Sequence, residues 1–380
     1  MRNSTRSDVD AFIVMDVMDA ARRAEAAGRR IIHMEVGQPG TSAPAGARVA
    51  VAQAMEQSAM GYTVALGLPE LRARIARTYK DRHDVEIDPA RVIVTPGSSG
   101  AFILAFTALF DAGARVGIGA PGYPSYRQIL RALDLVPVEI ATTAASRHQP
   151  RPGDIGAHRL DGLMVASPAN PTGTMLDRAA LGGLIEAADR AGAAFISDEI
   201  YHGIEYERQA VTALELSDDV YVINSFSKYY SMTGWRVGWM VVPDDHVRVI
   251  ERLAQNLFIC APHVSQIAAL AALDCDAELK ANLDVYRANR RLMLDGLPAA
   301  GFDRIAPPDG AFYVYADVSH LTDDSRALAA EILDQAGVAV TPGLDFDPAR
   351  GGGTLRFSYA ASTADIEAGL ARLKTFMDGR

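Results

Sequence analysis

A lysine among hydroxyl and guanidinium groups follows a β-branched run in the second half of the chain. The segment NSFSKYYSMTGWRVGW (224–239) places Lys228 beside Ser225, Ser227 and Arg236. These hydroxyls and the guanidinium can hold a phosphate dianion. A lysine beside such positive charge has a lowered pKa, which an amine nucleophile requires. A lone lysine after a strand is usually a solvated surface charge, so the interpretation as a nucleophile rests on these neighbours.

A second element suited to phosphate is the turn TPGSSGAF (95–102), which lies between a predicted strand and a predicted helix. Small residues such as Ser98 and Ser99 let the backbone approach a phosphate, and the helix N-terminus adds free N–H groups and a favourable dipole. Such a turn alone is usually only a turn. Together with the lysine segment, it predicts a phosphate cup.

An acid and a tyrosine end another predicted strand in SDEIY (197–201). If a pyridine ring with a phenolic oxygen binds here, Asp198 can face the ring nitrogen and keep it protonated. Tyr201, one helical turn after Asp198, can reach the phenolic oxygen. An aspartate here can also simply cap a helix. A lysine, an acid against a ring nitrogen and a phosphate cup are what pyridoxal 5′-phosphate requires.

Two proline-containing turns supply further candidates. SPANPTG (167–173) places Asn170 at a strand end, and APGYP (120–124) offers Tyr123 as a ring to stack on the cofactor. All of these residues follow predicted strands, and ligands bind outside the carboxyl ends of strands in open α/β sheets. The sequence therefore predicts a pyridoxal phosphate site at that edge.

The elements that must position these residues alternate along the chain. The predicted strands are 91–95, 115–119, 135–140, 160–167, 192–197, 220–225 and 235–242. Helical patterns between them predict βαβ units and an α/β fold, with a mostly parallel sheet flanked by helices. After about residue 260, one long helical pattern runs from Val264 past Arg290. The strands 311–318, 338–342 and 354–360 and two helices follow it, which predicts a smaller α+β lobe.

Composition excludes several function classes. The net charge of −10 argues against a nucleic-acid binder, and 49% hydrophobic with 22% charged residues is typical of a globular protein. The longest apolar helical run, 101–110, is too short to span a bilayer, and the N-terminal apolar stretch is too short for a signal peptide. We therefore expect a cytoplasmic protein without a membrane or nucleic-acid partner. Two cysteines form no disulfide framework, and His33, His202 and His263 have no metal-ligand spacing, so no metal is expected. For His202, a supporting or surface role is more plausible than catalysis.

Taken together, these motifs resemble the class I/II aminotransferases, the fold-type I pyridoxal phosphate enzymes of the aspartate aminotransferase superfamily. The resemblance covers nearly the whole chain, from VGQPG (36–40) through GYTVALGLPELRARIA (61–76) to LRFSYA (355–360). The segments SFSKYYSMTGWRVG and NPTG match motifs of the family and occur along the chain in the same order as in the family. The family implies a large domain at 46–284 with a sheet of the seven-stranded type, and a small domain formed by 1–45 and 285–380.

The resemblance implies a role for each candidate. Lys228 is the Schiff-base lysine and proton shuttle, Asp198 pairs with the ring nitrogen, and Tyr123 stacks on the ring. Asn170 and Tyr201 bond the phenolic oxygen. The phosphate is held by Ser98, Ser99, Ser225, Ser227 and Arg236.

Further implied features concern the substrate and a second chain. Arg356 resembles the arginine that clamps the substrate α-carboxylate, with the N–H of Gly37 nearby; without the resemblance, it would be read as an unremarkable surface arginine. Tyr62 resembles the tyrosine that reaches the phosphate of the neighbouring subunit, which implies a homodimer with shared active sites. The family also implies cis peptide bonds at Ala120–Pro121 and Asn170–Pro171.

The implied reaction is transamination between an L-amino acid and a 2-oxo acid, with 2-oxoglutarate expected as the acceptor. Two half-reactions at one site give a ping-pong mechanism. A β/γ-lyase or a decarboxylase on the same cofactor is the alternative, although Arg236 in GWRVG favours transamination. A non-catalytic regulator on this domain is a remote third reading, because the enzyme-like match begins near residue 12 and leaves no room for a helix-turn-helix domain.

The substrate is less well specified. Some aspartate-specific members carry a lysine at the position of Ser99, so its absence weakens an aspartate-only assignment. Phe12, Ile13 and Tyr313 are candidates to line a pocket for apolar or aromatic side chains. Ordinary core or arm packing is an equally good explanation of these three residues.

Overall fold

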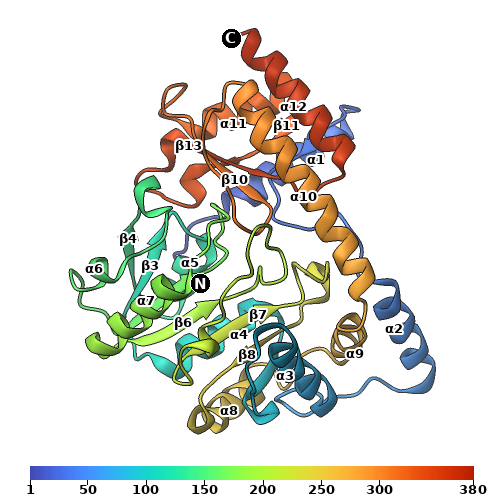
Figure 1. Cartoon of the computed structure of the whole chain (residues 1–380), viewed down its shortest axis with the longest axis vertical. Helices are drawn as coiled ribbons and strands as arrows, with labels where there is room; N and C mark the ends of the chain where they lie inside the picture. Colours follow the sequence, from blue (N-terminus) through green and yellow to red (C-terminus); the bar gives the residue numbers. More distant parts are fainter.

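Seven strands form the larger of the two main sheets in the computed structural model, which describes residues 1–380 (Figure 1). The strand order is β2-β8-β7-β6-β5-β3-β4, and only β8 runs antiparallel to its neighbours. The strands are β2 (Val92–Thr95), β3 (Arg115–Ala120), β4 (Val136–Ala141), β5 (Gly162–Ala166), β6 (Ala194–Asp198), β7 (Tyr221–Ser225) and β8 (Gly238–Val241). The predicted mostly parallel α/β sheet is confirmed.

The central strands are apolar on both faces because helices cover both faces. Successive residues of a strand point to opposite faces, so Ile93 packs into one hydrophobic cluster while Val94 packs into the other. One face is covered by α4 (Gly97–Leu109), α5 (Pro124–Ala132) and α8 (Val247–Leu257). The other is covered by α3 (Pro69–His83) and α7 (Arg178–Ala191). A short helix, α6 (Pro152–Ile155), precedes β5.

The smaller lobe is built from both ends of the chain. Its four-stranded sheet has the order β12-β13-β10-β9, and a separate pair joins β1 to β11 in parallel. These strands are β1 (Ile32–His33), β9 (Arg304–Ala306), β10 (Tyr313–Asp317), β11 (Val338–Ala339), β12 (Thr341–Pro342) and β13 (Thr354–Ser358). The helices are α1 (Ile13–Ala26), α11 (Ser325–Ala336) and α12 (Thr363–Asp378). The boundaries at 45/46 and 284/285 stay a prediction.

The single long helix expected from Val264 past Arg290 is wrong. The structure has α9 (His263–Ala272) and α10 (Asp276–Ala299), with a break at 273–275. Asp276 and Glu278 lie in the first turn of α10, where acidic side chains favour a helix start, and Glu278 also accepts the N–H of Ala45 at 3.0 Å. Because α9 packs against α2 (Ala45–Gln57) while α10 runs on to the smaller lobe, the chain must turn between them (Figure 1).

The predicted strand 338–342 is also divided, because β11 pairs with β1 whereas β12 pairs with β13. None of the helices combines the length and the apolar character needed to cross a lipid bilayer.

Candidate active site

The predicted site residues converge where the parallel strands end. Asp198 is the last residue of β6, Asn170 follows β5, and Lys228 follows β7. On the neighbouring strands, Ser225 lies opposite Gly238, and Gly238 lies opposite Thr95, directly before the start of α4. The register of the sheet therefore brings the two predicted phosphate segments to the same edge.

The amine of Lys228 points at backbone and aromatic groups rather than at a carboxylate. Its Nζ donates a hydrogen bond to the carbonyl of Gly37 at 2.5 Å and lies 5.8 Å from the centre of the Tyr201 ring. Burial, and then the positive charges of Arg356 and Arg236, lower the pKa of Lys228 to about 8, against the opposing effect of Asp198. A substantial fraction of this amine is thus neutral near pH 8, as a nucleophile or a proton acceptor requires.

Asp198 is almost completely enclosed, with 2% of its surface exposed. Its carboxylate accepts hydrogen bonds from the hydroxyl of Tyr126 and from the N–H of Ile200 at 3.1 Å. Burial disfavours the ionised form of Asp198 and raises its pKa to about 6. A cation placed opposite the carboxylate would stabilise the ionised form. Sequence reasoning missed Tyr126, which lies one turn of α5 after Tyr123 and packs edge-on against that ring, with centroids 5.2 Å apart.

Asn170 and Arg356 are joined directly. The Oδ1 of Asn170 accepts a hydrogen bond of 2.8 Å from Nη1 of Arg356. Since the amide oxygen is occupied, the amide nitrogen of Asn170 remains the donor for an acceptor group in the site.

The guanidinium of Arg356 packs against two aromatic rings. Its guanidinium carbon lies 4.4 Å from the centre of Tyr313 and 4.7 Å from that of Phe346. The side chain belongs to β13 and is only 3% exposed, so the reading as a surface arginine is wrong. Nη2 donates to the carbonyl of Glu35 and to Thr341, whereas Nε is buried and has no partner. A carboxylate ligand would satisfy that unpaired donor.

Tyr201 and Tyr313 connect the two sides of the site through a hydroxyl–hydroxyl hydrogen bond of 2.7 Å. The Tyr313 hydroxyl also lies against Gly37, where an added Cβ would stand 2.2 Å from it. Only a glycine therefore allows this approach. The N–H of Gly37, which was predicted to face the substrate, donates no hydrogen bond within the chain.

The predicted phosphate cup surrounds the start of α4. Gly97 has a φ of +72°, and a Cβ there would lie 2.6 Å from Nη2 of Arg236, so the guanidinium reaches the helix start only over a glycine. The first turn of α4, which contains Ser98 and Ser99, has no side-chain cap. Ser225 and Ser227 are buried and joined by a hydrogen bond of 2.8 Å between their hydroxyls. Free N–H groups, hydroxyls and one guanidinium thus gather around a space suited to a phosphate.

The N-terminal segment packs beside this space. Phe12 contacts the edge of Tyr123, with ring centroids 5.9 Å apart, and the carboxylate of Asp345 accepts the N–H groups of Ile13 at 3.0 Å and Val14 at 3.2 Å. A cavity of about 690 Å³ is lined by these first residues together with Ser99. Asp345 could not be predicted from the sequence, because the two residues that it bonds lie 331 and 332 positions away.

Other predicted features are placed as follows. The cis peptide bonds at Ala120–Pro121 and Asn170–Pro171 are confirmed, and Ser167–Pro168 is a third. Tyr62 is 82% exposed, outside the site of its own chain. No three His, Cys, Asp or Glu side chains gather so that they could hold a metal ion.

Comparison with known proteins resolves which family this arrangement belongs to. The family profile described as aminotransferase class I and II matches residues 29–373. The chain belongs to the class I and II aminotransferases. Valine–pyruvate aminotransferase of Mycobacterium tuberculosis is 46% identical over 99% of this chain and 98% of its own length.

Solved structures agree with this assignment of the aminotransferase. A protein of Silicibacter pomeroyi is 73% identical, with both chains fully covered and a TM-score of 0.96. The aspartate aminotransferase of Thermus thermophilus with maleate is 29% identical, with 99% of this chain and 100% of that chain covered and a TM-score of 0.92.

The fold-type I family implies pyridoxal phosphate, and the residues of this aminotransferase fit that group. The Gly97 cradle under Arg236, the free amide nitrogen of Asn170 and the buried carboxylate of Asp198 each offer what one part of the cofactor needs. The unpaired Nε of Arg356 offers a further donor for a substrate carboxylate.

Proposed function

We propose that this aminotransferase binds pyridoxal 5′-phosphate and moves an amino group between an L-amino acid and a 2-oxo acid by a ping-pong mechanism. The observation that carries the proposal is a half-buried lysine of lowered pKa, Lys228, whose amine bonds the Gly37 carbonyl in the field of both Asp198 and Arg356. An amine nucleophile, an acid and a carboxylate clamp thereby share one site.

The residues would divide the work as follows. Lys228 would hold the cofactor covalently, Asp198 would face its ring nitrogen, and Tyr123 would stack on the ring. Asn170 and Tyr201 would bond its phenolic oxygen. Its phosphate would lie against Ser98, Ser99, Ser225, Ser227 and Arg236.

When bound, pyridoxal phosphate supplies an electron sink for the bonds at the amino-acid Cα. Arg356 would bind the α-carboxylate and, with the N–H of Gly37, fix which Cα bond faces Lys228. The neutral Nζ of Lys228 would then take the proton from Cα as a general base. Asp198, as a carboxylate, would keep a proton on the nitrogen opposite it.

For the substrates, we propose an apolar amino acid as the amino-group donor. We propose both pyruvate and 2-oxoglutarate as acceptors. The M. tuberculosis relative is a valine–pyruvate aminotransferase, which supports pyruvate. Phe12 packs beside Tyr123, which supports an apolar side-chain pocket.

A kinetic panel tests this proposal. Valine, leucine, alanine, phenylalanine and aspartate should each be paired with pyruvate and with 2-oxoglutarate, and turnover measured for every pair. We expect the apolar donors to be used at the highest kcat/KM. Aspartate outpacing all of them by orders of magnitude would overturn the apolar pocket, and ammonia release without any 2-oxo acid would indicate a lyase instead.

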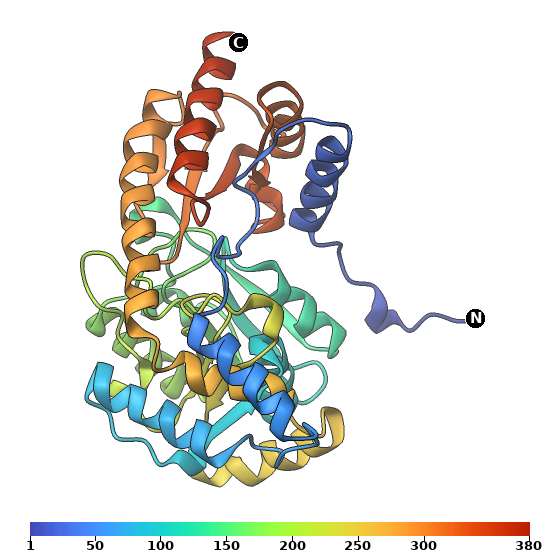
Figure 2. The same ribbon diagram turned by 90° about the vertical axis from the view of Figure 1, so that its right-hand side faces the viewer.

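We also propose a homodimer with shared sites. Large apolar side chains are exposed on and after α2 and at the end of α8, namely Val49, Met55, Val64, Leu257 and Ile259. Helix α2 lies on the face turned toward the viewer in Figure 2, and the first residues extend away from the rest of the chain. A second copy covering this face would remove the apolar side chains from water and bring Tyr62 toward the partner's phosphate cup. The two free cysteines suit a reducing compartment, which supports the cytoplasm as the proposed location.

Mixing two impaired variants tests the shared sites, with activity measured at a pyridoxal phosphate concentration too low to saturate Tyr62→Ala. A Tyr62→Ala subunit and a Lys228→Ala subunit form hybrid dimers in which one site keeps both native residues. An equal mixture should therefore regain about a quarter of wild-type activity, since about half the dimers are hybrids with one intact site each. Tyr62→Ala alone should weaken pyridoxal phosphate binding about 10- to 100-fold, as expected for a lost hydrogen bond to a charged group. A mixture no more active than the sum of its components would contradict shared sites.

A further inference from the structure

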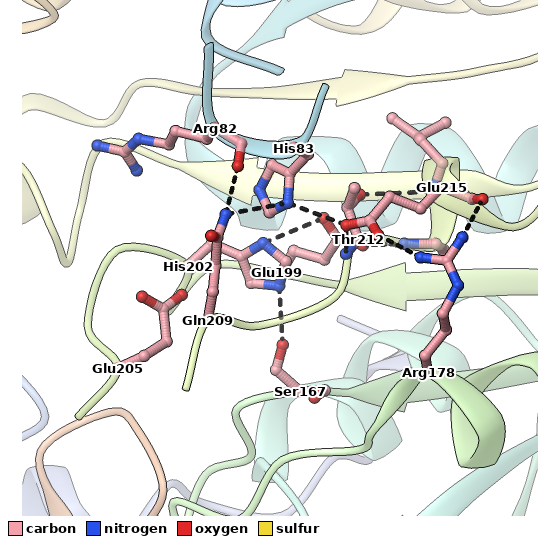
Figure 3. A network of polar contacts seen from close by, with 12 residues as sticks. Arg82, His83, Ser167, Arg178, Glu199, His202, Glu205, Gln209, Thr212 and Glu215 are labelled. Carbon is pink, nitrogen blue, oxygen red and sulfur yellow. Dashed lines mark hydrogen bonds and ion pairs between the residues drawn. The ribbon is translucent and has the colours of Figure 1, made fainter. Parts of the chain in front are cut away.

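The turn that carries Tyr201 rests on two buried polar side chains. Glu199 is 1% exposed and His202 is 6% exposed, so neither is the surface group that a polar residue in a turn commonly is. Both lie in the polar network of Figure 3, where their side chains point toward one another. Asp198 precedes this pair and Tyr201 stands between its members.

The hydrogen bonds of His202 define which of its nitrogens carries the proton. Nε2 lies 3.1 Å from the carbonyl oxygen of Ser167, and a carbonyl only accepts, so Nε2 must be the donor. Burial lowers the pKa of His202 to about 3, so the ring is neutral and its Nδ1 has a free lone pair.

Glu199 faces that lone pair. Its Oε1 accepts the N–H of Ala213 at 2.8 Å and the hydroxyl of Ser197 at 3.0 Å. Its Oε2 is buried without a hydrogen-bond partner and lies 3.5 Å from Nδ1 of His202. Burial raises the pKa of Glu199 to about 8, so near neutral pH this carboxyl carries a proton that it can direct at Nδ1.

The other charged groups around the pair are already engaged. His83, from α3, lies with its ring 5.6 Å from that of His202, and its Nδ1 contacts Glu215 at 3.1 Å. Glu215 is in turn bonded by Arg178 at 2.5 Å. Two further ionisable neighbours act only as nearby charges, Arg82 on His202 and Asp198 on Glu199. The guanidinium of Arg82 lies over the ring of Tyr229, 4.6 Å from its centre. Glu199 is therefore the group placed to orient the His202 ring.

The bond from His202 to Ser167 joins two segments of the proposed site. Ser167 begins the SPANPTG loop and precedes Asn170, while its N–H bonds the carbonyl of Asp198 at 3.2 Å. His202 directly follows Tyr201. No other side chain of residues 199–203 bonds the loop 167–174, so His202 adds the one side-chain bond to the backbone bond that already joins the loop to the end of β6.

We propose that His202, oriented by Glu199, is a positioning residue that sets Tyr201 and Asn170 at the separation needed to bond one phenolic oxygen. This inference rests on the proposed function, because that oxygen belongs to the cofactor. His202 touches neither cofactor nor substrate. It acts by holding two hydrogen-bond donors that come from different strands, and a displacement of about 1 Å in such a site costs about 100-fold in rate.

Two substitutions of His202 separate this role from simple space filling. In His202→Gln the amide nitrogen takes the place of Nε2 and can still donate to Ser167. In His202→Asn the amide nitrogen takes the place of Nδ1 and falls short of Ser167. We expect His202→Gln to resemble wild type. We expect His202→Asn to lose about 10- to 100-fold in kcat/KM, mainly in kcat, and to bind pyridoxal phosphate more weakly when the cofactor-free protein is titrated by fluorescence.

The visible absorbance band of the bound cofactor supplies a readout that stability alone would not change. In His202→Asn the donors to the phenolic oxygen shift, so the midpoint of the pH titration of this band should move. In His202→Gln the midpoint should stay in place. Tyr221→Phe is the matched control, since it removes a partly buried hydrogen bond, to His246 at 2.6 Å, at the far end of β7. It should lower the melting temperature and leave the titration midpoint unchanged.

Should His202→Asn fail to fold, Glu199→Gln and Glu199→Ala give the same comparison, because only glutamine keeps a donor toward Nδ1. Equal titration midpoints and equal cofactor affinities within either pair would overturn the positioning role. Failure of the wild-type protein to bind pyridoxal phosphate would instead overturn the proposed function, so the two failures are distinguishable.

Discussion

Replacing Lys228 with alanine is expected to lower the rate of complete turnovers by about 10⁴-fold or more, the upper range for removing a general base that also acts as a nucleophile. The side chain is half-buried, has a pKa near 8 and donates to the Gly37 carbonyl, so water does not easily replace it as the base. The measurement is steady-state transamination with the best donor and acceptor pair. The variant should still bind pyridoxal phosphate, now without a covalent bond, because the phosphate cup is untouched.

Lys280→Ala is the matched control for this prediction. Lys280 is exposed on α10, and its one ion pair, to Asp276, is long at 3.9 Å. Its loss should therefore leave the rate unchanged. A small primary amine added to Lys228→Ala should restore part of the lost rate, since it can enter the space left by the side chain and accept the Cα proton. Lys228→Ala turning over at the normal rate would contradict the assignment.

The second large effect is expected at Arg356. Arg356→Ala should lower kcat/KM by roughly 10²- to 10³-fold, in line with the loss of one partner of a buried, hydrogen-bonded charge pair. Most of the loss should appear in KM, because the arginine binds the carboxylate in both substrate and transition state. The substitution also leaves the Oδ1 of Asn170 without its partner, so kcat should fall as well.

Arg356→Lys distinguishes charge from shape. It keeps the positive charge but loses the planar fork that packs against Tyr313 and Phe346 and that presents Nε. We expect it to recover only a small part of the lost kcat/KM. A wild-type KM for the amino acid in Arg356→Lys would show that the substrate carboxylate binds elsewhere.

The sequence predicts those features of the fold and the site that depend on short stretches of residues. Apolar β-branched runs of four to six residues place the strands of the large sheet, and polar residues directly after them place Lys228, Asp198 and Asn170 at one edge. Strand order is not needed for this result, because the carboxyl ends of parallel strands share an edge whatever their order. The motif residues can therefore be predicted without knowledge of any contact.

Contacts between distant segments could not be predicted in the same way. Tyr126 bonds Asp198 from a different strand–helix unit, and Arg356 bonds the carbonyl of Glu35 from the opposite end of the chain. A carbonyl has no sequence signature, and a tyrosine on a buried helix face looks like ordinary core. For His202 the sequence left a supporting and a surface role open, since its partners are a carbonyl and a glutamate whose burial only the fold reveals.

The break between α9 and α10 shows the same limit in the backbone. The residues at 273–275 include no glycine or proline, so the helical pattern continues through them. The turn follows from tertiary packing, because α9 lies on α2 while α10 must reach the smaller lobe. Local preference was overruled there by contacts that lie far along the chain.

The visible absorbance spectrum of the purified protein tests the central claim most directly. With pyridoxal phosphate bound at Lys228, the protein should be yellow, and adding a competent amino acid without any 2-oxo acid should bleach the band as the cofactor takes up the amino group. Adding a 2-oxo acid such as pyruvate should then restore the band. A colourless protein that binds no pyridoxal phosphate would contradict the account, and so would a yellow one whose band no amino acid changes.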